Sequence, residues 1–387
     1  MKPIYLDNAA TTKVAPEVLK AMLPFFGELF GNAASEYRFS AEVRKAVETS
    51  RETISSFLGA SPFEIYFTSG GTESDNWAIK AAAQAMRSKG NHIITSKIEH
   101  HAVLKTCEYL EKQGFEVTYL GVDENGMVSP SELKAAIRPS TILVSVMYAN
   151  NEIGSIQRIK EIGEIAHRKN ILFHTDAVQA YGHIPIDVKA CHIDLLSASA
   201  HKLGGPKGVG LLYANSKAAL TAWVHGGSQE YGMRAGTLNT PGIVGFAKAT
   251  DLAGKNMAES IRREKGLRDY LIFRILAEIP GSRLNGDREN RLPNNTNFSF
   301  YKIDGSALLY SLDEQGIFVS SGSACTAKHN DTSHVLKAIG VPLEYINGAV
   351  RITLSSESTR EEMDYVADTL KMVIAALRGG RYIQGGN

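Results

Sequence analysis

The stretch TILVSVMY occupies residues 141–148 and is almost continuously apolar. A strand of this kind is typical of a parallel sheet that helices cover on both faces. Similar short runs lie on either side of it, at 64–69, 92–96, 116–120, 171–175, 194–198 and 208–213. Helical stretches separate many of them, at 72–89, 102–113, 131–137 and 159–169. This alternation predicts an α/β fold with a mostly parallel seven-stranded sheet.

The chain changes character after Gly254. A charged helical stretch at 258–277 is followed by strands at 296–300 and 350–354 and a final helix at 361–377, without regular alternation. A length of 387 residues also exceeds what one hydrophobic core usually serves. We therefore expect a large ligand-binding domain at 15–258, and a smaller α+β domain formed by 1–14 and 259–387.

Composition excludes several classes of function. The chain has 42 basic and 41 acidic residues, so no basic surplus indicates nucleic acid or an anionic membrane. The N-terminus lacks the apolar stretch of a secretory signal, and no apolar run approaches the roughly 18 residues that span a bilayer. We expect a cytoplasmic protein. The three cysteines have neither a disulfide framework nor metal-ligand spacing, so we expect no metal site.

Polar residues follow the carboxyl ends of several predicted strands. In open parallel sheets these ends line the ligand-binding edge, so residues far apart in sequence meet there. The candidates are Gly71, Thr72, His100, Asn150, Asn151, Asp176, Gln179, Ser199, His201 and Lys202. We expect them to share one site.

These residue types match the parts of pyridoxal phosphate. Its aldehyde needs a lysine and its ring nitrogen needs a carboxylate, for which Lys202 and Asp176 are the candidates. The flat imidazole of His100 suits stacking on the ring. The phosphate needs amide N–H groups at a helix start together with small polar groups. The remaining candidates are Gly71, Thr72, Ser199 and His201 for the phosphate, and Asn151 and Gln179 for the ring oxygen.

Other interpretations exist for each of these signals taken alone. A Gly-Gly-Thr before a helix is more often a turn with an N-cap. Asp176 could cap a loop, and His101 could replace His100. Lys207, in a Gly-Pro loop, could replace Lys202, although Lys202 follows its strand more directly. The agreement of the whole set favours the cofactor site.

The cysteines differ in their surroundings. Cys107 shares a helical stripe with Val103 and Leu110, which indicates a core residue, and Cys191 precedes an apolar strand. Cys325 lies in the small, polar stretch SSGSACTAKHN (320–330), which is typical of a mobile loop. Basic neighbours there could lower its pKa, as a nucleophile requires. The alternative is an incidental surface cysteine.

At this point the sequence resembles the NifS/IscS-type cysteine desulfurases, which are class-V aminotransferase-like pyridoxal phosphate enzymes of fold type I. The resemblance runs nearly end to end. It is carried by YLDNAATT (5–12), FTSGGTESDN (67–76), SKIEHHAVL (96–104), ANNEIGSIQ (149–157), HTDAVQA (174–180), SASAHKLGGPKG (197–208), RAGTLN (234–239), SSGSACT (320–326) and VRITL (350–354).

The resemblance implies a role for each matching position. Lys202 resembles the Schiff-base lysine, Asp176 the partner of the ring nitrogen, and His100 the stacking acid/base. Cys325 matches the cysteine that carries the persulfide. Further implied ligands are Gly71, Thr72, Ser199 and His201 for the phosphate, Asn151 and Gln179 for the ring oxygen, and Asn32, Asn151 and Arg351 for the substrate.

The resemblance also implies partners. Thr237 resembles a residue that reaches the phosphate of a neighbouring subunit, so we expect a homodimer. L-Cysteine is the implied substrate, and an iron–sulfur scaffold protein or another sulfur acceptor is the implied recipient. Some relatives have a longer C-terminal extension that binds the scaffold.

The chain departs from the common pattern at Ala33, Tyr37, Ser40, Ser228 and Ala235.

These implications together predict a cysteine desulfurase. Lys202 would remove the Cα proton, His100 would assist proton transfer, and Cys325 would attack the substrate sulfur. A selenocysteine lyase, a transaminase and a catalytically silent sulfur-transfer scaffold are the alternatives.

Overall fold

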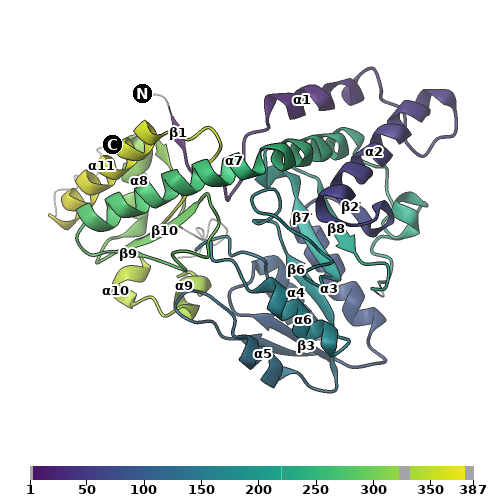
Figure 1. Ribbon diagram of the computed structural model, residues 1–387, viewed down its shortest axis with the longest axis horizontal. Helices are drawn as coiled ribbons and strands as arrows, with labels where there is room; N and C mark the ends of the chain where they lie inside the picture. Colours follow the sequence, from purple (N-terminus) through teal and green to yellow (C-terminus); the bar gives the residue numbers. More distant parts are fainter. Residues whose placement is uncertain (1–2, 219, 322–331, 380–387) are drawn as a thin grey trace.

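The computed structural model describes residues 3–218, 220–321 and 332–379 (Figure 1). Its large sheet has seven strands in the spatial order β2-β8-β7-β6-β5-β3-β4. They are β2 (Ile65–Thr68), β3 (His92–Ser96), β4 (Glu116–Leu120), β5 (Thr141–Ser145), β6 (Leu172–Asp176), β7 (Leu195–Ser199) and β8 (Gly210–Ala214). Neighbours pair in parallel except at β8, which is antiparallel to both β2 and β7. The predicted fold class is confirmed.

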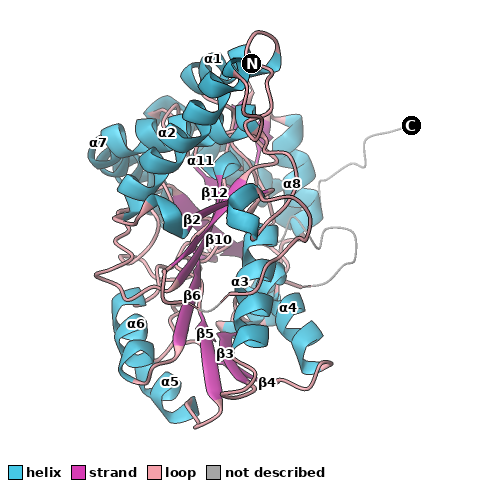
Figure 2. Cartoon of the chain, turned by 90° about the vertical axis from the view of Figure 1, so that its right-hand side faces the viewer, coloured by secondary structure: helices cyan, strands magenta, loops and turns pink. Residues whose placement is uncertain are grey.

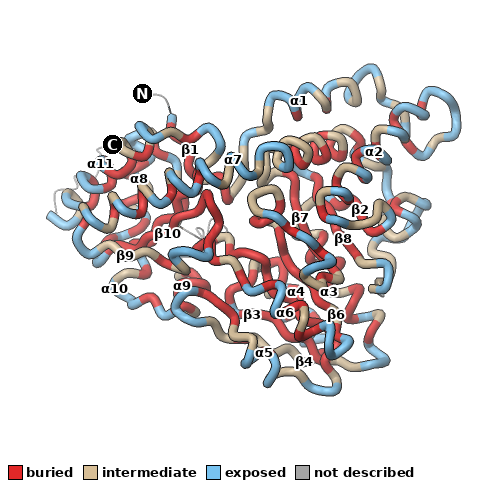
Figure 3. Tube along the Cα trace, in the orientation of Figure 1, coloured by how far each residue is buried: buried red, intermediate tan, exposed pale blue. Residues whose placement is uncertain are grey.

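Helices cover both faces of this sheet, as its apolar strands require. Figure 2 shows α3 (Gly71–Ala85) and α4 (His101–Glu111) on one face, and α5 (Pro130–Ala136) and α6 (Ile159–Arg168) on the other. The second face also receives α2 (Ala41–Leu58), whose Val43, Val47 and Ile54 join the same core as Ile162 of α6. The sheet is therefore buried throughout its centre (Figure 3).

A second core forms around smaller sheets. β9 (Ser282–Leu284), β10 (Asn295–Phe300) and β12 (Ala349–Thr353) are antiparallel, and β1 (Ile4–Tyr5) pairs in parallel with β11 (Ile317–Phe318). Ile4 and Leu6 therefore pack with residues far along the chain, such as Val350. The accompanying helices are α8 (Gly305–Glu314), α9 (His334–Ala338), α10 (Leu343–Ile346) and α11 (Arg360–Arg378).

One helix, α7 (Thr240–Glu278), contributes to both cores. Its Ile243 and Phe246 belong to the large core, whereas Leu271 and Ile275 belong to the second. The sequence predicted a helix only at 258–277. The part of α7 before it contains Gly242, Gly245 and Gly254, and glycine has low helix propensity. Packing against α2 and α1 (Pro16–Met22) overrides that propensity. The expected domain boundary at 258 falls inside this helix, and the division into two domains stays a prediction.

Within the described part of the chain, no helix is both long enough and apolar enough to cross a membrane.

A buried ion pair fixes α2 to the edge of the large sheet. Arg51 of α2 is 2% exposed and Glu230 is 4% exposed. The guanidinium donates to both Glu230 carboxylate oxygens, at 3.0 and 2.8 Å, and to the Ile65 carbonyl. The backbone N–H of Phe67 also donates to Glu230. Each charge in this dry site depends on the other.

We expect Arg51→Met to lower the free energy of unfolding by about 3–5 kcal/mol, because it leaves the Glu230 carboxylate buried without its cation. Denaturant unfolding measures the change. The matched control is Lys105→Met, which removes an exposed pair with Glu108 and should cost less than about 1 kcal/mol. Equal losses in the two variants would contradict the assigned importance of burial.

Candidate active site

The carboxyl edge of the large sheet gathers most of the residues that the sequence singled out. Asp176 is the last residue of β6 and Ser199 the last of β7. A short 3-10 helix, Ala200–Lys202, follows β7 directly. Gly71 begins α3 after β2, and His100 is the N-cap of α4 after β3. The strand topology therefore brings these groups to one edge.

Asp176 and His100 lie close together. A carboxylate oxygen of Asp176 and a ring nitrogen of His100 are within 4.8 Å of each other, together with an oxygen of Asp75. Burial raises the pKa of Asp176, while His100, the Val178 N–H and Lys202 act in the opposite direction. Asp176 is therefore a buried acid whose ionised form depends on nearby positive charge.

The two adjacent histidines have different surroundings. His100 Nδ1 accepts a hydrogen bond from the Ala102 N–H at 3.1 Å, which assigns the proton of the neutral ring to Nε2. Burial lowers the pKa of His100, so the ring is mainly neutral at pH 7. His101 instead lies against His334, with ring centroids 4.9 Å apart. His100 is thus the histidine beside Asp176.

Lys202 faces the N-terminal segment. Its Nζ donates to the carbonyls of Ala9 at 2.6 Å and Ala10 at 2.8 Å. Gln179 donates to the same Ala9 carbonyl at 3.0 Å. The alternative lysine, Lys207, is exposed. Lys202 and Gln179 are therefore brought together by one backbone carbonyl.

The start of α3 provides a cradle for an anion. Its first amide groups have no carbonyl partner inside the helix, and they lie beside Ser199. A Cβ on Gly70 would lie 3.8 Å from Ser199 Oγ, and one on Gly71 would lie 2.5 Å from Val178 Cγ2. Gly71 thus allows the helix to approach the loop after β6. Thr72, the next residue, could add its hydroxyl to the cradle.

The N-terminal segment that crosses this edge contains functional groups to which no role was predicted. Thr11 Oγ1 lies 3.2 Å from His201 Nδ1, and the Thr12 N–H donates to the His201 carbonyl. Burial, Lys202 and Lys207 lower the pKa of His201 to about 4, so its ring is neutral. The small polar run DNAATT at 7–12 was the available signal for this segment.

Of the three proposed substrate ligands, Arg351 and Asn151 are in contact with each other. Arg351 of β12 is 3% exposed and forms an ion pair with Asp7, with 2.7 Å between Nη2 and Oδ1. Its Nη1 donates to the Asn151 carbonyl at 2.9 Å. The Asn32 side chain accepts from the Ala34 N–H. Among the described residues no hydrogen bond joins Asn32 to Arg351.

Two further predicted residues remain, Thr237 and Cys325. Thr237 is exposed in the segment before α7. Arg234, three residues earlier, forms two hydrogen bonds with Glu73 in the first turn of α3, at 2.9 and 3.1 Å, which holds that segment near the cradle. Cys325 lies outside the described residues.

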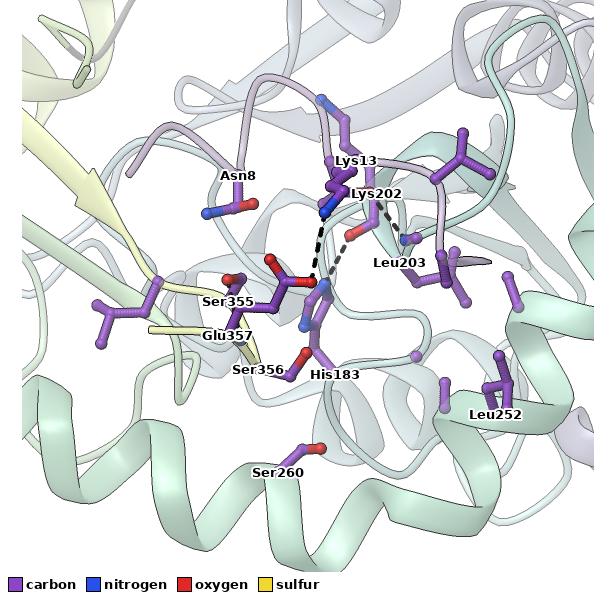
Figure 4. Close-up of a pocket in the computed structure, with 18 of the residues that line it drawn as sticks. Asn8, Lys13, His183, Lys202, Leu203, Leu252, Ser260, Ser355, Ser356 and Glu357 are labelled. Atoms are coloured by element: carbon purple, nitrogen blue, oxygen red, sulfur yellow. Dashed lines mark hydrogen bonds and ion pairs between the residues drawn. The ribbon is translucent and has the colours of Figure 1, made fainter. Parts of the chain in front are cut away.

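A cavity of about 930 Å³ lies on one side of the N-terminal segment. Figure 4 shows Lys202, His183, Lys13 and Glu357 around it, with His183 Nε2 donating to the Lys202 carbonyl at 2.9 Å. Of the described site residues, neither Asp176 nor His100 is part of its lining. The cavity therefore borders Lys202 but is not the space beside Asp176.

The family model for aminotransferase class-V matches residues 4–366. The chain belongs to this family. It is 56% identical over 379 residues to a protein of Clostridium botulinum (strain Hall) named "Cysteine desulfurase IscS", covering 97% of this chain and 96% of that protein. A protein of the same name from Methanosarcina thermophila is 54% identical over 377 residues, covering 97% and 93%. Within the family, the chain is therefore a member of the cysteine desulfurases.

Solved structures agree with this assignment. One titled "NIFS-LIKE PROTEIN" has a TM-score of 0.91 and 40% identity, covering 97% of this chain and all of that chain. Another, "SspA in complex with cysteine", has a TM-score of 0.80 and 38% identity, covering 91% and 98%. The family is dependent on pyridoxal phosphate, and the donors at the sheet edge fit the parts of that cofactor. They are a buried carboxyl, a lysine, a flat imidazole and an amide-lined cradle.

We expect Gly71→Ala to weaken binding of pyridoxal phosphate to the apoprotein by at least about tenfold, or ~1.4 kcal/mol. The added methyl group would meet Val178 and displace the first amides of α3. Fluorescence titration of the apoprotein measures the affinity. Gly266→Ala in α7 is the control, because no atom lies within 4 Å of its added Cβ. Unchanged affinity in Gly71→Ala would contradict the cradle.

Proposed function

We propose that this chain removes the sulfur of L-cysteine, with pyridoxal phosphate as cofactor and Cys325 as acceptor. L-Cysteine and the Cys325 thiol give L-alanine and a Cys325 persulfide. The substrate Cβ–S bond breaks, an S–S bond forms, and the hydrogen that alanine gains at Cβ balances the proton of the consumed thiol. One sulfur atom moves, so no external oxidant or reductant is required.

One observation carries this proposal: a chain related over nearly its whole length to proteins named cysteine desulfurase keeps Asp176 and His100 within 4.8 Å at the sheet edge. Lys202 follows the adjacent strand, β7. A buried acid, a neutral imidazole and a lysine at one edge are the groups that the cofactor needs, and a catalytically silent protein would not require them.

The cofactor would be held by groups from several elements. Lys202 would bind its aldehyde carbon, Asp176 its ring nitrogen and His100 the face of its ring. When bound, it would supply an electron sink for the bonds at the substrate Cα and Cβ. The other proposed ligands are Gly71, Thr72, Ser199 and His201 for the phosphate, Asn151 and Gln179 for the ring oxygen, and Thr237 of the partner subunit for the phosphate.

Two side chains of this chain would move protons. Lys202 Nζ, once released from the carbonyls of Ala9 and Ala10, is the base for the substrate Cα proton. His100 exchanges a proton through Nε2, because the Ala102 N–H occupies Nδ1. A mainly neutral ring can serve either the substrate thiol or Cys325.

Arg351 would bind the substrate carboxylate, aided by Asn32 and Asn151. A guanidinium suits a carboxylate because it can donate two parallel hydrogen bonds. Arg351 already pairs with Asp7, so the substrate carboxylate would share this cation with Asp7 or displace it. The ion pair keeps the guanidinium in place before substrate arrives.

The persulfide would pass to an iron–sulfur scaffold protein or another sulfur acceptor. The active unit would be a homodimer, in which Thr237 of one subunit would bind the phosphate held by the other. A cytoplasmic location also stays a prediction.

We expect Cys325→Ser to lose sulfur transfer while retaining the bound cofactor, because serine offers no thiolate to attack the substrate sulfur. After incubation with L-cysteine, mass spectrometry of the peptide that contains residue 325, together with alanine release, measures the effect. Cys191→Ser should behave as the unchanged chain. A transaminase would be indifferent to both substitutions.

In the same assay, Lys202→Ala should abolish turnover. Borohydride reduction should label the peptide of residue 202 in the unchanged chain and not in this variant. Labelling at Lys207 would overturn the assignment of the lysine.

We expect His100→Ala to slow alanine formation by about 10²–10⁴-fold, which is the usual contribution of a positioned proton-transfer group. The borohydride label at Lys202 should persist, because the variant keeps the lysine. Steady-state kinetics provides the measurement, with His101→Ala as the control. A larger loss in the control would show that the wrong histidine had been chosen.

A further inference from the structure

Asp75 is a buried acid to which the proposed function gives no role. It is the fifth residue of α3 and is 1% exposed. One of its carboxylate oxygens lies within 4.8 Å of both Asp176 and His100. Asp75 thus lies close to the acid proposed to bind the ring nitrogen.

The contact of Asp75 with His174 is not an ion pair. Asp75 Oδ1 lies 3.6 Å from His174 Nε2, too far for a hydrogen bond. The ring nitrogens of His174 are instead bound to Ser145 Oγ at 2.8 Å and Ser197 Oγ at 3.1 Å. Burial lowers the pKa of His174 to about 3, so the ring carries no charge.

The titratable groups around Asp75 are mostly acidic. Burial is the main reason why the pKa of Asp75 is raised, and Asp176 of β6 and Glu99 of the turn before α4 raise it further. A hydrogen bond with Ser197 of β7 lowers this pKa. Asp75 Oδ1 has no hydrogen-bond partner among the described residues. An ionised carboxylate in such surroundings would lose its hydration without compensation.

Two carboxyls this close in a dry interior do not both ionise. Asp176 is the better place for the charge, because it accepts from the Val178 N–H at 2.9 Å and feels the positive charge of Lys202. Asp75 has neither a backbone donor nor a cation in contact among the described residues. The proton therefore belongs on Asp75.

We propose that Asp75 is held as a neutral carboxylic acid and acts as a positioning residue, so that the single negative charge at this end of β6 lies on Asp176. The functional meaning of this arrangement rests on the proposed cofactor site. The protonation of Asp75 does not, because it follows from groups of the apoprotein.

Infrared spectroscopy of the apoprotein tests the protonation directly. At pH 7 we expect a carbonyl band of a protonated carboxylic acid that is shifted by labelling with [¹³C]aspartate and lost in Asp75→Asn. Glu99 is also buried, with a pKa raised to about 8, so Glu99→Gln is the matched control. It should remove a different band, which aspartate labelling does not shift.

The pH dependence of apoprotein stability provides an independent test. A folded-state pKa above that of the unfolded chain means that Asp75 costs stability as pH rises from the unfolded value, about 3.9, toward the folded value. The amide that replaces this carboxyl in Asp75→Asn does not titrate. The Tm of Asp75→Asn relative to that of the unchanged chain should therefore rise from about pH 5 to pH 8.

Three results would overturn the proposal: no aspartate-labelled acid band lost in Asp75→Asn, a Tm difference that does not change with pH, or one divalent metal ion bound per chain between Asp75, His100 and Asp176. Each is measured without turnover. The proposal can therefore fail while alanine formation and the Cys325 persulfide are still observed, and the reverse also holds.

Discussion

The carbonyl oxygen of Ala9 is the point on which the arrangement of the site depends. It accepts from Lys202 Nζ, which follows β7, and from Gln179, which follows β6. The same segment continues to Asp7, whose carboxylate pairs with Arg351 of the second core. Residues 7–12 thus lie between the sheet edge and the smaller sheets, and they contact both the proposed cofactor lysine and the proposed substrate arginine. The strand topology brings the cofactor-site residues to the sheet edge, and this segment links them to the second core.

Most of the large sheet could be predicted from sequence because its strands are buried on both faces. A run such as 141–148 has few alternatives to a central parallel strand. The length of α7 could not be predicted in this way. A Cβ on Gly245 would lie 2.7 Å from Met22 Sδ, so this glycine serves close packing with α1, whereas in sequence it resembles a helix breaker. Such contacts depend on residues far away in the sequence.

The candidate site also contains residues that could be predicted from sequence and residues that could not. Asp176, Ser199 and Lys202 were predictable because strand ends converge whatever the details of packing. Asp75 was not, since Glu-Ser-Asp-Asn in a helix resembles a solvated face, and the residues near it in the fold, such as His174 and Ser197, are far away in the sequence. Arg351 was found through a family resemblance, but its pairing with Asp7 joins positions 344 residues apart. No periodicity in the sequence could reveal that pair.

The single helix α7 has a mechanical consequence. At about 1.5 Å per residue it is roughly 58 Å long, and its two ends are embedded in different hydrophobic cores. An uninterrupted backbone hydrogen-bond ladder resists bending far more than a loop would, so the cores cannot swing freely about this connection. Dividing the chain within α7 would leave each fragment with part of the helix, whose buried apolar residues would then be exposed. The two cores therefore depend on the same helix and are unlike modules that could be exchanged separately.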